Sequence, residues 1–229
     1  MHLKRLNAPD SWPIKKKGIT FITRQSPGAH KMRESMPMVL VLREMLDYAK
    51  TTREAKMVLH GKNVLVDKKV VTKHDVPVGL MDRIEITKTG EHFTLLYNEK
   101  GKFHLKKTSK EEANTKICKI IGKKMLRGKK LQLNLYDGKN IVLAKNEYAV
   151  GDSVVISLPD LKIKKHLKCD KGAKVYITSG KHVGKVGEIK EIHQGKDFEN
   201  DRIVFKSKKD TCETLKSYAF VIEKEFGNE

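Results

Sequence analysis

The chain has few cysteines, and they form no recognisable pattern. Cys118, Cys169 and Cys212 are odd in number and far apart, and no Cys-x-x-Cys pair occurs among the 229 residues. A disulfide framework and a cysteine-rich zinc site are therefore not expected, and a reducing cytosol fits the composition. Isolated cysteines of this kind usually behave as small buried hydrophobic residues.

Long apolar segments are also missing. The longest apolar run, Met36 to Leu42, is broken by Pro37 and falls well short of the roughly 20 residues that a membrane-spanning helix needs. The basic start of the chain is not followed by an apolar segment, so it does not resemble a secretory signal. With 38% hydrophobic and 6% aromatic residues, the chain can bury only modest cores. These features predict a cytoplasmic protein without a membrane partner.

Acidic residues are scarce relative to basic ones. Asp and Glu number 28 against 48 Lys and Arg, a formal net charge of +20. Such an excess needs a polyanion to neutralise it, and nucleic acid is the most common polyanion, ahead of an anionic membrane surface. We expect two or three small modules joined by basic segments rather than one compact enzyme.

Catalytic and metal-binding motifs are absent from the sequence. No Gly-x-Ser-x-Gly, His-Glu-x-x-His or nucleotide-binding motif occurs. The histidines lack ligand spacing, and a histidine without partners is usually packed or solvated. They include His30, His60, His74, His92, His104, His166 and His193. We therefore predict no enzyme, no metal, no cofactor and no small-molecule substrate.

Residues 1–35 are predicted to form a basic arm. Eight Lys or Arg face two acids there, and proline and glycine interrupt any periodicity. Such a segment is not expected to fold alone, so we predict that it is disordered until RNA orders it. Trp12, the only tryptophan, either packs the arm onto the body or stacks on a base or sugar.

Residues 36–90 are predicted to form a small α/β module. Apolar spacing from Val39 to Ala49 indicates a first helix, and Thr51 with Glu54 gives a capping box for a second that ends at Gly61. Residues 64–66 and 70–71 read as the two strands of a hairpin around the basic turn 67–69, and residues 83–86 alternate like a further strand.

The remaining chain is predicted to be β-rich. Residues 91–165 hold short strands with turns at Gly122 and Gly128 and a strong hairpin signal at Asp137-Gly138, which indicates a small β domain. Residues 162–168 look like a basic connector. Residues 166–229 form a last β module with strands at 175–177, 186–189, 202–205 and 218–222.

A glycine-rich loop in this last module has the clearest local pattern. Gly180, Gly184 and Gly187 are spaced to allow positive φ angles in a tight loop. Lys181, His182 and Lys185 decorate the loop, so amides and amines together suit phosphate oxygens. The stretch resembles the KOW motif of ribosomal proteins and elongation factors, which an SH3-like barrel carries. The alternative is a glycine-rich hairpin with a solvated basic face. A Walker loop is excluded because no Gly-Lys-Ser/Thr ending follows.

Residues 36–86 resemble the S-four RNA-binding module, chiefly in T-T-R-E-A-K-M-V-L and V-L-V-D-K-K-V. The RNA face of that module consists of basic residues on its helices and hairpin. By position, the resemblance implies RNA contacts from Arg43, Arg53, Lys56, Lys62, Lys68 and Lys69. Any one of them could equally be a solvated charge, and Arg53 could instead pack its stem on the helix pair. As a group, they add Coulomb and counterion-release terms.

The opening stretch H-L-K-R-L-N-A-P-D-S-W-P-I-K-K closely resembles the signature of the archaeal and eukaryotic small-subunit ribosomal protein family S-four-e. The resemblance spans the chain and favours the archaeal form. It implies an α+β, mostly β fold: a small α/β S-four module, a central small β domain and a C-terminal SH3-like KOW barrel. It also implies a structural protein bound to small-subunit ribosomal RNA and adjoining other ribosomal proteins. The further RNA-binding candidates are Lys4, Arg5, Lys15, Lys16, Lys17, Arg24, Gly180, Lys181 and Lys185.

Two alternatives use the same modules outside the mature ribosome. An RNA-modifying enzyme such as a pseudouridine synthase would need a separate catalytic domain, for which this sequence offers only short strands and lysines. An RNA chaperone or elongation factor would rely on the KOW module. The basic arm weighs against this alternative, because an extended segment that only a partner orders suits permanent burial in an RNA assembly.

Overall fold

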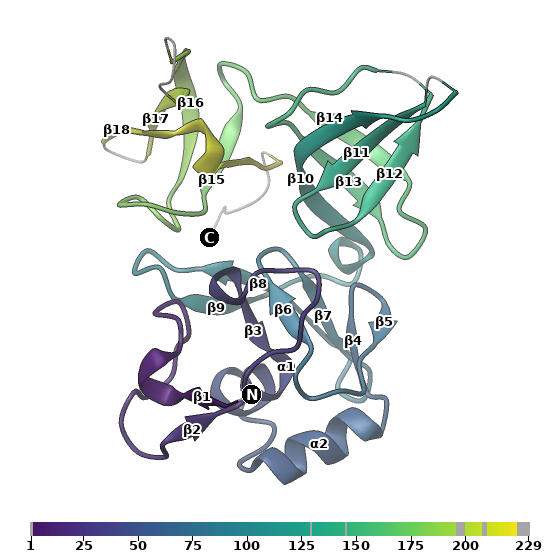
Figure 1. Ribbon diagram of the computed structural model, residues 1–229, viewed down its shortest axis with the longest axis vertical. Coiled ribbons are helices and arrows are strands. Elements are labelled where there is room, and N and C mark those ends of the chain that lie inside the picture. Colours follow the sequence, from purple (N-terminus) through teal and green to yellow (C-terminus); the bar gives the residue numbers. More distant parts are fainter. Residues whose placement is uncertain (1, 129, 145, 196–199, 208–209, 224–229) are drawn as a thin grey trace. The chain divides into compact units, whose positions relative to one another are not determined.

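The computed structural model describes residues 2–128, 130–144, 146–195, 200–207 and 210–223. The chain divides into two compact units: the first comprises residues 1–97, 102–116 and 158–160, and the second comprises residues 98–101, 117–157 and 161–229. Strands greatly outnumber helices among the described residues (Figure 1). No helix in these ranges has the length and apolar character needed to cross a bilayer.

The amino-terminal segment of the first unit is folded onto the module that follows it. Strands β1 (Leu3–Lys4) and β2 (Phe21–Ile22) pair with each other, and a 3-10 turn, Arg5–Asn7, follows β1. Trp12 is fully buried and its indole nitrogen donates to the carbonyl of Ser35 at 2.8 Å. The predicted disordered arm is therefore wrong, and the packing alternative for Trp12 is confirmed. Apolar residues scattered among the lysines anchor the segment, and they are Leu3, Ala8, Trp12, Ile14 and Ile22.

The two predicted helices of the first unit are present. Helix α1 (Met38–Leu40) continues as a π-helical turn, Val41–Met45, and its apolar residues are buried. Helix α2 (Thr52–His60) begins with the predicted capping box, in which the amide of Glu54 donates to the Thr51 hydroxyl at 3.2 Å and the Glu54 carboxylate accepts from the Thr51 amide. The local sequence signals were sufficient here because capping depends on neighbouring residues alone.

The main sheet of the first unit has the order β5-β4-β7-β8-β9. Its strands are β4 (Val64–Val66), β5 (Lys69–Val70), β7 (Arg83–Ile86), β8 (Glu91–Tyr97) and β9 (Phe103–Lys107). The predicted 64–71 hairpin is present, with its turn at Asp67 and Lys68, both at positive φ. A second, two-stranded sheet joins β3 (Ser35–Pro37) to β6 (Pro77–Gly79).

The structure corrects the predicted boundary at residue 90. Strand β8 pairs with β7, opposing Phe93 to Ile84, and β9 pairs with β8. Both strands therefore complete the sheet of the first unit, and the central β domain begins near residue 117. The apolar residues of β8 that suggested a new core instead complete an existing one.

The central sheet of the second unit has the order β12-β11-β10-β13-β14. Its strands are β10 (Thr115–Met125), β11 (Leu131–Leu135), β12 (Asn140–Leu143), β13 (Ser153–Ser157) and β14 (Ile163–Leu167). Gly122 was predicted as a turn but lies inside β10, where the register shifts after Ile120. The predicted connector 162–168 is mostly strand β14, whose backbone pairs with β13 although its side chains are largely basic.

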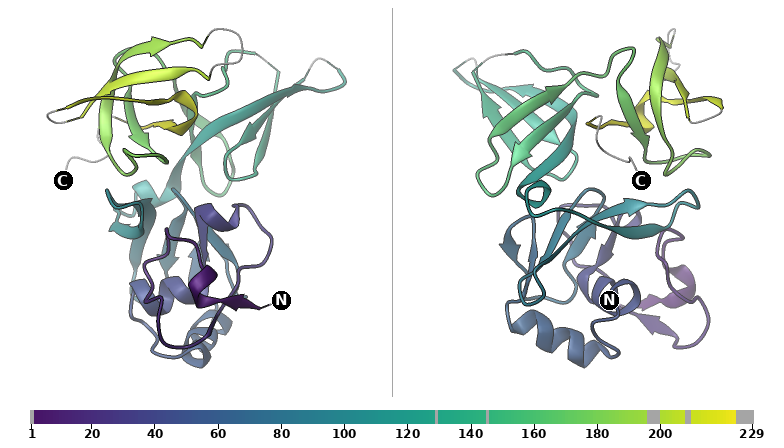
Figure 2. Two further views of the ribbon diagram at one scale, coloured as in Figure 1. Left: turned by 60° about the vertical axis from the view of Figure 1, so that its left-hand side comes forward. Right: turned by 180° about the vertical axis from the view of Figure 1, so that it is seen from behind.

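The last sheet has the order β18-β17-β16-β15-β19. Its strands are β15 (Lys174–Ile177), β16 (Val186–His193), β17 (Arg202–Lys206), β18 (Thr211–Leu215) and β19 (Ala219–Val221). Its core is an apolar cluster of buried side chains that includes Val175, Ile203 and Phe205. Figure 2 shows that the strands of this sheet are strongly curved. Strand β18 was not predicted from the sequence, because Cys212 is its only buried residue.

Candidate nucleic-acid interface

The predicted cations of the amino-terminal segment fall into two groups. Lys4, Lys15, Lys17 and Arg24 are exposed. Lys16 is partly buried, with its amine 2.6 Å from the carbonyl of Ala8 and 3.2 Å from the Asp10 carboxylate. Arg5 is buried, and its guanidinium donates to the carbonyl of Lys15 at 2.8 Å. Arg5 thus holds the segment together and is not presented to a polyanion, contrary to its prediction as an RNA contact.

The helix-borne candidates divide in the same way. Arg53 is exposed and Lys56 is partly exposed on α2, three residues apart, opposite the face that buries Ala55 and Leu59. Arg43 is less available, because its guanidinium donates to the Thr52 hydroxyl at 2.9 Å and pairs with Glu44 at 2.8 Å. Arg43 therefore ties the π-helical turn to the start of α2.

The hairpin candidates lie beside α2 in sequence. Lys62 is exposed at positive φ just after the helix, and Lys69 is exposed on β5. Lys68 pairs with Glu85 of β7 at 2.6 Å, which neutralises part of its charge. Four of the six predicted S-four cations keep exposed surface, and their side chains form no ion pair or hydrogen bond within the part of the chain that the structure describes. They are Arg53, Lys56, Lys62 and Lys69.

The glycine-rich loop of the last sheet has the predicted backbone at Gly180 and Gly184, but the prediction is wrong for Gly187, which lies inside β16. Gly180 and Gly184 have φ angles of 84° and 78°, and the amide of Gly184 donates to the carbonyl of Ile177 at 2.8 Å. Lys181 is exposed and Lys185 is partly buried. Burial, followed by the nearby charges of Lys185 and Lys181, lowers the pKa of His182 below its ordinary value. The loop presents its two lysines on a tight turn.

The hairpin of β10 and β11 supplies cations that the sequence interpretation missed. Lys123, Lys124, Arg127 and Lys130 are exposed where this hairpin reaches out from the body of its sheet (Figure 2). Lys123 also donates to the carbonyl of Tyr148 at 2.7 Å. The run K-K-M-L-R-G-K-K was visible in the sequence, and its density of charge was the signal that could have identified it.

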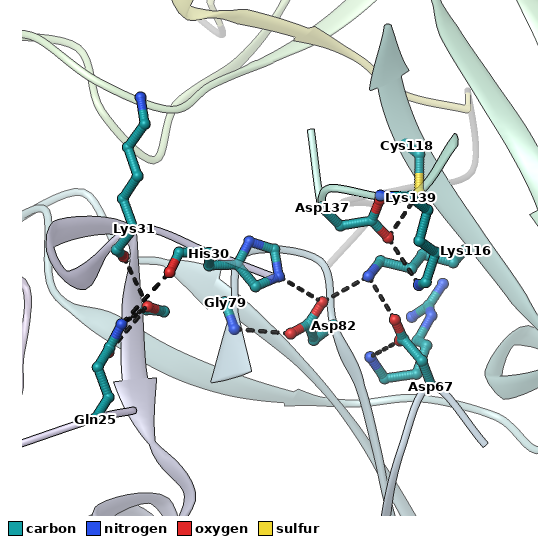
Figure 3. Close-up of polar contacts among 12 residues, drawn as sticks. Gln25, His30, Lys31, Asp67, Gly79, Asp82, Lys116, Cys118, Asp137 and Lys139 are labelled. Carbon is teal, nitrogen blue, oxygen red and sulfur yellow. Dashed lines mark hydrogen bonds and ion pairs between the residues drawn. The ribbon is translucent and has the colours of Figure 1, made fainter. Parts of the chain in front are cut away.

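A buried ionic centre organises the first unit (Figure 3). Lys116, with 1% of its side chain exposed, contacts Asp67 at 2.7 Å and Asp82 at 2.5 Å. Asp82 also contacts His30 at 3.0 Å and accepts from the amide of Gly79 at 2.8 Å. Burial is the largest single influence on Asp82 and acts to raise its pKa. The charge of Lys116, the contact with His30 and the hydrogen bond from the Gly79 amide together outweigh burial, so the pKa of Asp82 lies below its usual range.

This ionic centre is structural and does not resemble a ligand site. It joins the 67–68 turn, the β6–β7 connection, the segment before β3 and the start of β10. Among the residues that the structure describes, no group of three or more His, Cys, Asp or Glu side chains is placed to hold a metal ion. The sequence could not reveal the centre, since its contacting pairs are separated by 34 to 52 positions and nothing local links them.

Comparison with known proteins identifies the family. Three family models match: the RS4NT domain over residues 1–33, the ribosomal family S4e over 89–163 and the KOW motif over 171–206. The small ribosomal subunit protein eS4 of Methanocella arvoryzae is 40% identical over 224 residues, which cover 98% of this chain and 94% of that protein. This chain belongs to the eS4 family.

Two further eS4 proteins are similar to this chain over most of its length. The eS4 protein of Methanocaldococcus jannaschii is 38% identical, over 96% of this chain and 93% of its own length. The crystal structure of the 30S ribosomal protein S4e from Thermoplasma acidophilum superposes with a TM-score of 0.73 at 33% identity, covering 84% of this chain and 96% of that one. The family consists of ribosomal proteins and not of enzymes, as the sequence predicted.

Proposed function

We propose that this chain is a structural component of the small subunit of the cytoplasmic ribosome, where it binds and stabilises ribosomal RNA. The observation that carries the proposal is the full-length similarity to eS4 proteins. The net charge of +20 and the exposed cations on every module support it, because binding at several phosphates releases counterions and the contributions add. Neighbouring ribosomal proteins are its expected protein partners.

The finer architecture is part of the same proposal. We infer that α1, α2 and the β4–β5 hairpin form an S-four RNA-binding module, and that the last sheet is an SH3-like KOW barrel. The order of two helices followed by a hairpin, and the tight glycine loop between β15 and β16, support these assignments.

Salt dependence and co-sedimentation test the function. If about six phosphates are neutralised on duplex-like RNA, the logarithm of the binding constant should fall with the logarithm of salt concentration at a slope near −5. The protein should also stay with the small subunit during centrifugation in high salt. A flat salt response would contradict RNA binding through phosphate neutralisation. A protein found largely in the free fraction would favour an RNA-modifying or RNA-chaperone role outside the mature ribosome.

The exposed cations should differ in what they recognise. Lys4, Lys15 and Lys17 are flexible point charges, so replacing all three with Ala should weaken binding to native and random RNA about equally. Arg53, Lys56 and Lys62 lie on or next to a rigid helix and can match the shape of one RNA fold. Their triple Ala variant should therefore lose more affinity for native ribosomal RNA than for random RNA.

A matched control removes the same charge elsewhere. Lys73, Lys88 and Lys110 are exposed and lie outside the predicted contact set. If K73A/K88A/K110A weakens binding as much as either test variant on both RNAs, all cations are interchangeable and the S-four module has no special role. Competition titrations of the three variants against wild type give the comparison.

A further inference from the structure

The β1–β2 ribbon of the amino-terminal segment has one buried face and one exposed face. Its two strands are antiparallel, with Leu3 opposite Ile22 and Lys4 opposite Phe21. Side chains alternate along a strand, so the buried Leu3 and Ile22 define the inner face and the exposed Lys4 and Phe21 the outer one. The ribbon is the purple pair of strands in Figure 1.

The outer face exposes large apolar side chains. Phe21 is 51% exposed, and Leu6 and Ile19, just beyond the paired residues, are 72% and 74% exposed. The ring of His2 lies 5.2 Å from that of Phe21, tilted by 47°, and thus contacts the aromatic ring while half of Phe21 remains open. Grouped exposure of this kind usually marks an interaction surface.

The charge around this face fits an anionic partner. Residues 2–24 contain six Lys or Arg and a single acid, Asp10, which pairs with Lys16. Lys4 lies directly across from Phe21 in the ribbon. The bond from the Arg5 guanidinium to the carbonyl of Lys15 places the backbone of Lys15 beside the turn that follows β1. An exposed aromatic ring next to lysines is typical of sites where unpaired bases stack while amines contact the phosphates.

We propose that Phe21 is a stacking platform for an unpaired RNA base, with Lys4 and Lys15 contacting the adjoining phosphates. The sequence pointed to Trp12 as the one candidate for stacking in this segment, but Trp12 is buried and bonded to Ser35. Phe21 takes that role because it is an exposed aromatic ring that lies directly across the ribbon from Lys4. The inference rests on the proposed RNA-binding function and specifies the form of RNA that this segment recognises.

The test compares unpaired with paired RNA. The probe is a short single-stranded RNA carrying 2-aminopurine, whose fluorescence responds to stacking, and the reference is the fully paired duplex of the same length. Phe21→Ala should bind the single strand about tenfold more weakly, because base–aromatic stacking is usually lost on such a change. Its affinity for the duplex should change less than about twofold, and the fluorescence response to stacking should disappear.

Two further variants separate stacking from apolar contact. Phe21→Tyr keeps the aromatic face and should retain the wild-type affinity for the single strand, whereas Phe21→Leu keeps apolar volume and should behave like the Ala variant. If Phe21→Leu binds like wild type, or Phe21→Ala loses nothing, the stacking proposal is wrong. Equal melting temperatures of the four proteins show that the half-exposed site was changed without unfolding.

A protein partner at this face gives a different pattern. Leu6→Ala and Ile19→Ala would then reduce co-sedimentation with small subunits as much as Phe21→Ala does, with no effect on single-stranded RNA, and that result overturns the proposal. If wild type binds neither RNA, the proposed function itself fails. If wild type binds both but Phe21→Ala is indistinguishable from it, only the stacking inference fails.

Discussion

The first unit and the last sheet stabilise their interiors in different ways. The first unit places Lys116, Asp67, Asp82 and His30 together in its interior, whereas the last sheet closes over an apolar cluster around Ile203 and Phe205. A buried group of charges destabilises the fold when one of its members is removed, but while it is complete its directional contacts fix the positions of the segments that carry it. Apolar packing is less directional and does not depend on pH. The first unit should therefore be the sensitive part of the molecule.

Loss of Lys116 should have the largest effect. Lys116→Met removes the ammonium group that contacts both Asp67 and Asp82 in the interior, and breaking such a buried pair costs about 3 to 5 kcal/mol. Unfolding in urea, followed by the fluorescence of Trp12, reports on this unit because Trp12 is the only tryptophan and is buried there. Lys124→Met on the exposed part of β10 is the control and should change stability by less than about 0.5 kcal/mol. Equal stabilities of the two variants would contradict the structural role of the centre.

The apolar cluster should respond to volume and not to charge. Ile203→Ala removes buried methyl groups and should destabilise the last sheet by about 2 to 5 kcal/mol, while Ile203→Val should cost about 0.5 to 1.5 kcal/mol. Hydrogen exchange of amides in β15, β16 and β17 measures the loss. The same loss at pH 4 and pH 7 is expected, and a strong pH dependence would count against the contrast between the two interiors.

Mild acid should weaken the first unit selectively. The pKa of Asp82 is lower in the folded than in the unfolded state, where it is about 4. The stability from this group is therefore fully present above about pH 5 and is lost as pH falls below about 4 toward the folded pKa. The stability difference between wild type and Asp82→Asn should shrink by about 1 kcal/mol between pH 6 and pH 3. Asp10→Asn, at an exposed ion pair, should show no comparable trend.

A second pH effect concerns Lys119 of the second unit, a buried cation that donates to backbone carbonyls. Its amine donates to the carbonyls of Ser217 at 2.7 Å and Ala219 at 2.6 Å, and burial lowers its pKa to about 8. The unfolded state then binds more protons between about pH 8 and pH 10, so stability from this group rises with pH. The advantage of wild type over Lys119→Met should widen by about 1 to 3 kcal/mol over that range. A constant difference would show that Lys119 remains charged throughout.

Sequence reasoning succeeded where structure depends on neighbouring residues. The capping box of α2, the hairpin turn at Asp67-Lys68 and the glycine loop at 180–184 all follow from local rules. It failed where distant partners decide. Strand β14 looked like a basic connector because its pairing with β13 uses the backbone, and the amino-terminal segment looked disordered because Trp12 finds its partner 23 residues away. The ionic centre could not be predicted for the same reason.

Gly79 shows how a contact between distant residues limits which amino acids the sequence can hold. Its backbone has no need of glycine, yet a Cβ atom there would lie 2.3 Å from the imidazole ring of His30. The constraint therefore belongs to the pair of positions and not to a turn. In relatives that carry a smaller side chain at position 30, position 79 becomes free to hold alanine, and the two positions should change together. Covariation between them would be a record, in sequence alone, of a contact that no local pattern reveals.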